Sequence, residues 1–232
     1  MKRSTELEMM DARDNPRELL EGDLKNLRLL NRYLGGARAL RCAMAPVLAQ
    51  DGVVQLNILD VGAGSGDLAA EIVRWCARRG VAADVITVDR DPVTAALAAR
   101  CNRAVSGITS LRADAAALPF APRSFDCVMA SQFLHHFSES QIIELLRAWA
   151  RLARRAIVVS DLVRQPLAYY GIRALTRLCT RNVMTLTDAP LSVRRAFTIH
   201  EWREIFHGAA VGSVTIEPLL PFRMGARIEV AN

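Results

Sequence analysis

The sequence predicts an α/β protein with a doubly wound, mostly parallel sheet of seven strands. Three observations carry this prediction. Strand-like and helix-like segments alternate regularly from about residue 56 to residue 162. The segment Phe125–Ala130 is almost continuously apolar, as expected for a parallel strand that is buried on both faces. The first apolar run ends in a turn with three glycines, which is typical of a strand-to-helix junction that approaches a ligand.

The chain begins with a polar segment, residues 1–14, which we expect to be flexible. Two helices should follow within residues 15–50. Asn15, Pro16 and Glu18 predict the first helix start, with an N-cap, a proline at the first helical position and a capping box. Gly35 should end this helix, and the second carries its apolar residues at helical spacing.

Five strands and their connecting helices then follow in turn. The expected strands are residues 56–61, 85–88, 108–111, 125–130 and 156–159. Asp91 and Pro92 predict the start of one connecting helix, and Ser138 with Gln141 forms the capping box of another. Right-handed connections between parallel strands place any ligand beyond their carboxyl ends.

The alternation of strands and helices ends after Asp161. Residues 163–197 are predicted to form a helical insertion that we expect to act as a lid. One helical stretch is predicted in it, with Leu167, Tyr170 and Leu178 on a shared face. Thr198 should cap a further helix, and short strands near residues 214–216 and 227–230 complete the sheet. Residues 15–232 are therefore expected to form a single domain.

Composition excludes several classes of protein. The net charge is +6, yet the basic residues are dispersed along the chain, which argues against a dedicated nucleic-acid surface. The five cysteines are widely separated, so neither a disulfide framework nor a zinc site, nor any other metal site, is predicted. Without an apolar leader or a long apolar run, we expect a cytoplasmic protein, monomeric or homodimeric, with no membrane insertion.

Polar and glycine residues gather where successive strands end. The first strand ends in Asp60, Gly62, Ala63, Gly64 and Gly66, whose spacing differs from the dinucleotide fingerprint because Asp67 stands where that pattern needs glycine. The second strand ends at Asp89. An ionised carboxylate there suits two vicinal hydroxyls and would repel a 2′-phosphate, which disfavours NADP.

Together these features resemble the cofactor motifs of class I S-adenosylmethionine-dependent methyltransferases, over roughly residues 55–162. The resemblance implies a Rossmann-like fold and S-adenosylmethionine as cofactor. It also implies that the glycine turn contacts the methionine and ribose, Asp89 the ribose hydroxyls, Arg90 the adenine face, and Asp114 the adenine amino group. The remaining cofactor contacts are expected from Asp60, Ala115, Ser131 and Gln132.

The segment Ala117–Phe120 and the run Leu134–Phe137 look like the small-molecule methyltransferases that include enzymes of quinone biosynthesis. Histidine takes up a proton near neutral pH, and we favour His136 over His135 as the base that activates an oxygen nucleophile. The alternative is that both pack or cap the turn before Ser138. Tyr170 and Arg194 are the candidate substrate residues in the insertion.

The sequence therefore predicts methyl transfer to an oxygen, or less favourably a carbon, of an apolar or aromatic small molecule such as a phenolic metabolite. Two alternatives remain open. One is C-methylation in quinone assembly, and the other is a non-catalytic cofactor-binding module that acts through a partner.

Overall fold

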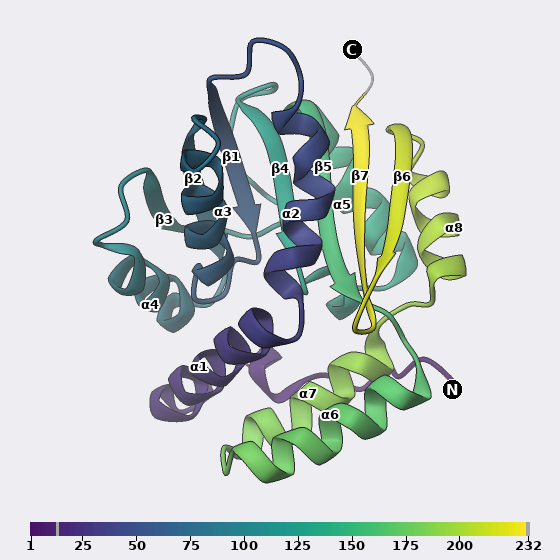
Figure 1. The fold of residues 1–232 in the computed structure, drawn as a ribbon. Helices are drawn as coiled ribbons and strands as arrows, with labels where there is room; N and C mark the ends of the chain where they lie inside the picture. Colours follow the sequence, from purple (N-terminus) through teal and green to yellow (C-terminus); the bar gives the residue numbers. More distant parts are fainter. Residues whose placement is uncertain (13, 231–232) are drawn as a thin grey trace.

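A seven-stranded sheet forms the centre of the protein in the computed structural model, which describes residues 1–12 and 14–230 (Figure 1). In spatial order the strands are β3 (Ile108–Arg112), β2 (Ala82–Asp89), β1 (Gln55–Val61), β4 (Phe125–Ser131), β5 (Ala153–Leu162), β7 (Arg223–Val230) and β6 (Gly212–Leu219). Only β7 runs antiparallel to its neighbours β5 and β6. The strand order reverses between β1 and β4, so a crevice is expected beyond their carboxyl ends. The predicted fold class is confirmed.

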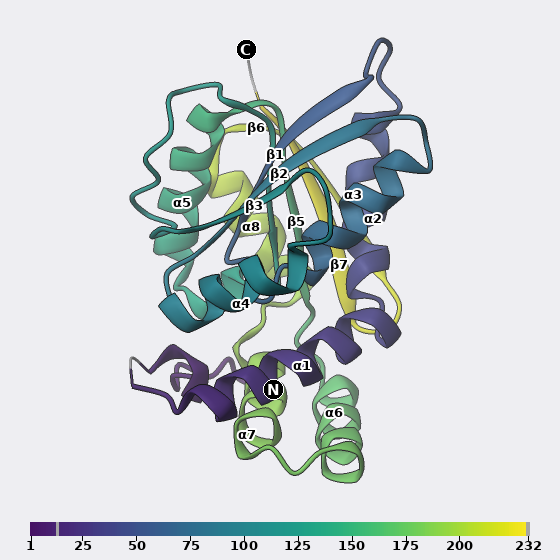
Figure 2. The ribbon, with the colours of Figure 1, turned by 90° about the vertical axis from the view of Figure 1, so that its left-hand side faces the viewer.

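Helices cover both faces of this sheet (Figures 1 and 2). On one face lie α2 (Gly36–Leu48) and α3 (Asp67–Ala77), whose Met44 and Ile72 are fully buried. On the other lie α5 (Glu139–Leu152) and α8 (Ile199–Ala209), which bury Trp149 and Trp202. Helix α4 (Pro92–Asn102) packs beside β2 and β3. Each face therefore has its own apolar core.

The carboxyl ends of the parallel strands face a third group of elements, which Figure 1 shows below the sheet. These are α1 (Arg17–Tyr33), α6 (Pro166–Cys179), α7 (Val183–Arg195) and the N-terminal segment with the short helix η1 (Met9–Asp11). The short helix η2 (Leu134–His136) follows β4 at the same edge. No helix in the described ranges is long and apolar enough to cross a membrane.

Most helix starts match the sequence prediction, and one does not. The side chains of Asp91, Ser138 and Thr198 each accept a hydrogen bond from a backbone N–H of the helix they begin. Asn15 does not cap α1, which begins one residue later than the predicted proline start. Its amide instead donates to the carbonyls of Met9 and Ala12. The competing acceptors lie in the N-terminal segment, which the sequence predicted to be flexible.

The insertion also differs from its prediction, because it holds two helices and not one. The chain is extended at Thr180, and Asn182 then caps α7 by accepting a hydrogen bond from the N–H of Thr185 at 3.0 Å. The expected apolar face of the first helix does not pack inward. Leu167, Tyr170 and Leu178 are 70%, 64% and 86% exposed. The second helix of the insertion, α7, packs inward instead, and its Met184 and Val193 are buried.

Candidate active site

The turn after β1 is built from backbone that only glycine adopts without strain. Gly62, Gly64 and Gly66 have φ of 68°, 56° and 69°. The N–H groups of Gly62 and Ala63 both donate to the carbonyl of Val88, at 2.9 and 3.1 Å. At Gly62 a Cβ atom would lie 2.1 Å from the Phe133 ring. Gly62 therefore packs against Phe133 only because it has no side chain, and the residues of the turn also line a cavity.

Asp89, at the end of β2, is tied to this turn. Its Oδ2 accepts a hydrogen bond from the N–H of Gly64 at 3.2 Å, and its Oδ1 accepts one from the N–H of Asp91 at 3.0 Å. Burial raises the pKa of the Asp89 carboxyl although both hydrogen bonds oppose this. The hydroxyl groups of a ligand would donate further hydrogen bonds to this carboxylate.

A cavity of about 510 Å³ extends along the carboxyl edge of the sheet from the glycine turn to η2. Eleven of the predicted site residues line it: Gly62, Ala63, Gly64, Asp89, Arg90, Asp114, Ala115, Ser131, Gln132, His135 and His136. These residues come from the ends of four strands, as expected for an open α/β sheet. The remaining walls come from α1, α7 and the N-terminal segment.

Four predicted residues lie outside the cavity lining. Asp60 is buried beneath the turn, where burial and the neighbouring carboxylates of Asp67 and Asp89 raise its pKa well above the usual value. Gly66 is the N-cap residue of α3 and faces Asn102. Tyr170 is exposed on α6, and Arg194 pairs with Glu6 at 3.7 Å. The insertion thus reaches the cavity through α7 residues such as Asp188, Ala189 and Ser192.

The residues that follow β4 shape the middle of the cavity. Gln132 has a positive φ of 51°, and its side-chain amide donates to Asn31 of α1. The hydroxyl of Ser131 is buried, and within residues 1–12 and 14–230 it has no hydrogen-bond partner. An unpaired buried hydroxyl at the wall of a cavity is a group that a ligand can satisfy. Sequence reasoning did not identify Asn31, which lies in a helix that carried no site motif.

His135 and His136 form a stacked pair, with ring centroids 4.5 Å apart. Each ring is held by a different carboxylate. Nδ1 of His135 lies 2.7 Å from Oδ1 of Asp161, and Nδ1 of His136 lies 3.0 Å from Oδ2 of Asp11. Both contacts are short enough to fix the ring orientation. Both histidines line the cavity.

The carboxylates behind the histidines favour ionisation. Burial would raise the pKa of Asp161, but its charge interaction and hydrogen bond with His135 hold that pKa below the usual value. The same two effects from His136 outweigh burial at Asp11 and lower its pKa. Asp161 stands at the end of β5, so the strand-end rule that selected Asp89 also applies to it. Asp11 carried no such signal.

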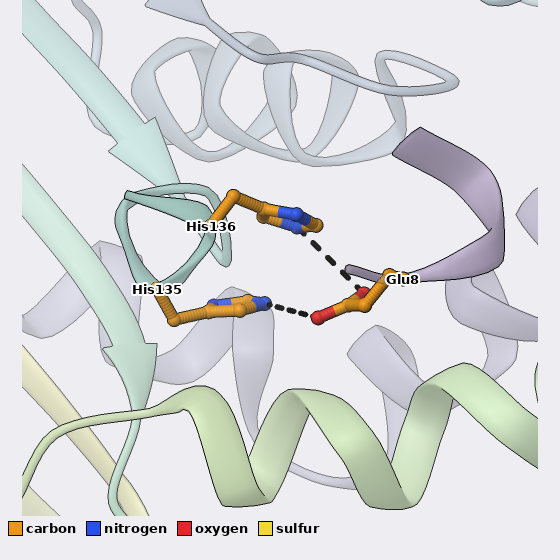
Figure 3. Close-up of side chains that lie close together, drawn as sticks. All are labelled: Glu8, His135 and His136. Carbon is orange, nitrogen blue, oxygen red and sulfur yellow. Dashed lines mark ion pairs between the residues drawn. The ribbon is translucent and has the colours of Figure 1, made fainter. Parts of the chain in front are cut away.

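The N-terminal segment lines this end of the cavity, and Figure 3 shows its Glu8 facing His135 and His136. Asp188 of α7 accepts hydrogen bonds from the N–H groups of Met9 and Met10, both at 2.9 Å. Arg3 donates to the carbonyls of His135 and Phe137 at 3.1 and 2.7 Å. Glu8 is 2% exposed, and burial raises its pKa to about 7. A segment predicted to be flexible thus supplies part of the site.

Comparison with known proteins shows that this chain is similar to methyltransferases in sequence and fold. Residues 58–156 match the family model of a methyltransferase domain. No curated protein sequence matches the chain significantly. Among solved structures, an S-adenosylmethionine-dependent methyltransferase from Aquifex aeolicus superposes with a TM-score of 0.62 at 14% identity, covering 94% of this chain and 100% of that one.

Two further structures are larger than this chain. The CurJ carbon methyltransferase has a TM-score of 0.68 at 14% identity, with 91% of this chain and 59% of that chain covered. An O-methyltransferase family 2 protein from Planctomyces limnophilus, in complex with apigenin, has a TM-score of 0.64 at 17% identity, with 94% and 62% covered.

The central segment, residues 58–156, is therefore a methyltransferase domain, and the fold around it is that of class I methyltransferases. The predicted methyltransferase domain and its Rossmann-like fold are confirmed, and these similarities are consistent with S-adenosylmethionine as the cofactor.

Proposed function

We propose that the protein transfers the methyl group of S-adenosylmethionine to a hydroxyl oxygen of an apolar or aromatic small molecule. The observation that carries this proposal is the continuity of the cavity, which joins the glycine turn to the paired histidines in one space of about 510 Å³. That volume lies within the usual range for small-molecule sites. Donor and acceptor then meet in a single chamber.

The donor belongs at the glycine turn. Its ribose hydroxyls would donate to the carboxylate of Asp89, with Asp114 near the adenine amino group and Arg90 beside the adenine. Burial, and then repulsion from the carboxylates of Asp67 and Asp89, raises the pKa of the Asp60 carboxyl. A cationic sulfonium nearby relieves such repulsion, whereas an anionic nucleotide would increase it.

The acceptor belongs between the donor and η2. This part of the lining includes five large apolar side chains, those of Leu7, Met10, Phe133, Phe137 and Leu162. An apolar or aromatic acceptor buries its surface there, and only its reacting hydroxyl needs a polar partner. Tyr170 and Arg194, the substrate residues expected from the sequence, are not among the residues that line this cavity.

Methyl transfer is an in-line displacement, so alignment in a closed site supplies much of the rate. The bond between acceptor oxygen and methyl carbon forms while the bond between sulfur and methyl carbon breaks, leaving S-adenosylhomocysteine. The hydroxyl proton goes to Nε2 of His136, whose Nδ1 is held by Asp11. His136 is the more accessible of the pair, with 13% of its side chain exposed against 3% for His135.

The experiment is incubation with methyl-labelled S-adenosylmethionine and a panel of phenols, followed by identification of the labelled product. We expect a methyl ether, with kcat reduced in His136→Gln and donor affinity retained. His200→Gln is the matched control, because His200 is exposed on α8 and outside the cavity lining. Full turnover by His136→Gln would remove the base role, and donor binding without transfer to any acceptor would favour a non-catalytic module.

A carbon acceptor is the second candidate, because the fold also resembles the CurJ carbon methyltransferase. The same imidazole could remove a proton from an activated carbon, as required for C-methylation in quinone assembly. NMR of the labelled product separates the two, since an O-methyl and a C-methyl carbon resonate in different regions.

A further inference from the structure

Three side chains converge at the closed end of the cavity (Figure 3). Nε2 of His135 lies 3.6 Å from Oε1 of Glu8, and Nε2 of His136 lies 3.8 Å from Oε2. Both distances are too long for hydrogen bonds. Nε2 of His135 and Oε1 of Glu8 are buried and have no hydrogen-bond partner among the described residues. The three side chains thus converge on one region, where one atom of Glu8 and one of His135 are left without a hydrogen bond from the described residues.

The other ring nitrogen of each histidine is already occupied. Nδ1 of His135 is held by Asp161, and Nδ1 of His136 is held by Asp11, at 2.7 and 3.0 Å. When Nδ1–H donates to a carboxylate, the imidazole is neutral and its lone pair lies on Nε2. Metal-binding histidines are held in this way, by a carboxylate that fixes the tautomer and orients the ring.

We propose that Glu8, His135 and His136 form a binding site for a divalent transition metal ion, with zinc as the best fit. Zinc takes nitrogen and carboxylate ligands at about 2.0–2.2 Å with tetrahedral geometry, which places ligand atoms roughly 3.4 Å apart. The two nitrogen-to-oxygen separations exceed this by only a few tenths of an ångström. The cluster atoms all lie within 4.8 Å of one another, so small side-chain rotations close the site.

The charges around the cluster are compatible with a cation. Glu8, Asp11 and Asp161 supply three carboxylates, whereas Nε of Arg195 lies 3.5 Å from Oε1 of Glu8 and opposes binding. Arg195 is anchored elsewhere, donating to the backbone carbonyls of His136 and Glu6. The hydroxyl of Ser192 donates to Oε2 of Glu8 at 3.0 Å and fixes the carboxylate.

Three protein ligands leave a fourth position of a tetrahedral ion free, which is the pattern of catalytic zinc sites. All three ligands line the cavity, so that position is open to the acceptor. If the acceptor binds there, a step that rests on the methyl transfer proposed above, the ion would lower the pKa of its hydroxyl and the proton would leave to water. His136, whose Nε2 would then hold the ion, would act as a metal ligand and not as the base.

No motif in the sequence indicates this site, because its carboxylate comes from the N-terminal segment and its histidines from η2. The cysteine pattern predicts no metal site. The spacing of His135 and His136 also differs from the sequence patterns typical of zinc sites.

Metal titration tests the proposal without donor or acceptor. The protein is stripped with a chelator and titrated with Co²⁺, whose visible absorption reports coordination number. We expect one ion per chain with the intense bands of a tetrahedral site, and displacement by Zn²⁺. Glu8→Gln and His136→Gln should abolish the bands. Asp11→Asn should weaken binding by roughly 10–100-fold, as loss of a carboxylate behind a ligand histidine does.

Two controls make the result decisive. His200→Gln and Glu204→Gln alter an exposed histidine–glutamate pair and should leave the titration unchanged. Retained binding of S-adenosylhomocysteine in Glu8→Gln shows that this variant is folded. Wild-type protein without Co²⁺ bands, or bands that persist in Glu8→Gln, would overturn the proposal. Either result leaves the methyl-transfer proposal intact, since that is tested by the labelled product.

Discussion

Replacement of Gly62 by alanine tests whether the turn after β1 requires a residue without a side chain at this position. The new Cβ atom would lie 2.1, 2.4 and 2.6 Å from three carbons of the Phe133 ring. Phe133 cannot move aside freely, because its ring packs against Phe137 and Trp149 with centroids 5.0 and 6.4 Å away. Gly64→Ala is the matched control. Its φ of 56° is also positive, but its Cβ would lie 3.6 Å from the nearest atom, in Leu24.

Both variants pay for a left-handed backbone, at about 1–2 kcal/mol each. Only Gly62→Ala adds overpacking, which typically costs about 1–3 kcal/mol. We therefore expect Gly62→Ala to lower the free energy of unfolding by about 1–3 kcal/mol more than Gly64→Ala does. In a chain of this size that difference lowers the melting temperature by roughly a further 2–10 °C.

Urea unfolding without S-adenosylmethionine is the appropriate assay, since donor binding would itself shift the apparent stability. A double-mutant cycle with Phe133→Ala tests the cause: removal of the ring should cancel the excess cost of Gly62→Ala. Equal stabilities of Gly62→Ala and Gly64→Ala, or an excess cost that survives in the Phe133→Ala background, would refute the reasoning.

Three further predictions follow from other parts of the cavity. Asp89→Asn removes the charge from hydrogen bonds to the ribose, so donor affinity in calorimetry should fall by roughly 10–100-fold; an unchanged dissociation constant would contradict the assigned role. Asp23 is buried on α1 with Thr185 as its donor, and burial raises its pKa to about 6. Because this pKa is above the unfolded value, the contribution of Asp23 to stability is full below pH ~4 and is lost as the pH rises through about 6. Asp23→Asn lacks this loss, so in urea unfolding its stability relative to wild type should rise by about 1 kcal/mol between pH ~5 and pH ~8; a pH-independent difference would show that Asp23 does not titrate in this range. Asp188→Ala removes the acceptor for the N–H groups of Met9 and Met10, so the N-terminal segment should detach from the cavity. The KM for the acceptor should then rise several-fold, while donor affinity, and the kinetics of the control Thr187→Ala, stay near wild type.

The sequence by itself determined the sheet, most of its helices and the residues that we assign to the donor. Strand and helix periodicity are local properties, and residues after successive parallel strands meet at one edge whatever the details of packing. The glycine turn, Asp89, Asp114 and the histidine pair were therefore identifiable from order alone. Asp91, Ser138 and Thr198 were equally predictable as helix caps, because a cap needs only its own helix.

Only the tertiary structure decided the acceptor half of the site. Glu8 and Asp11 meet His135 and His136 across more than a hundred residues of chain, and nothing local distinguishes them from solvated carboxylates in a polar tail. Tyr170 was expected at the substrate site but is exposed. Helical spacing predicts which residues share a face, but it does not predict whether that face is buried. Burial depends on which elements pack together, so the choice of acceptor-site residues was made by the fold and not by the local sequence.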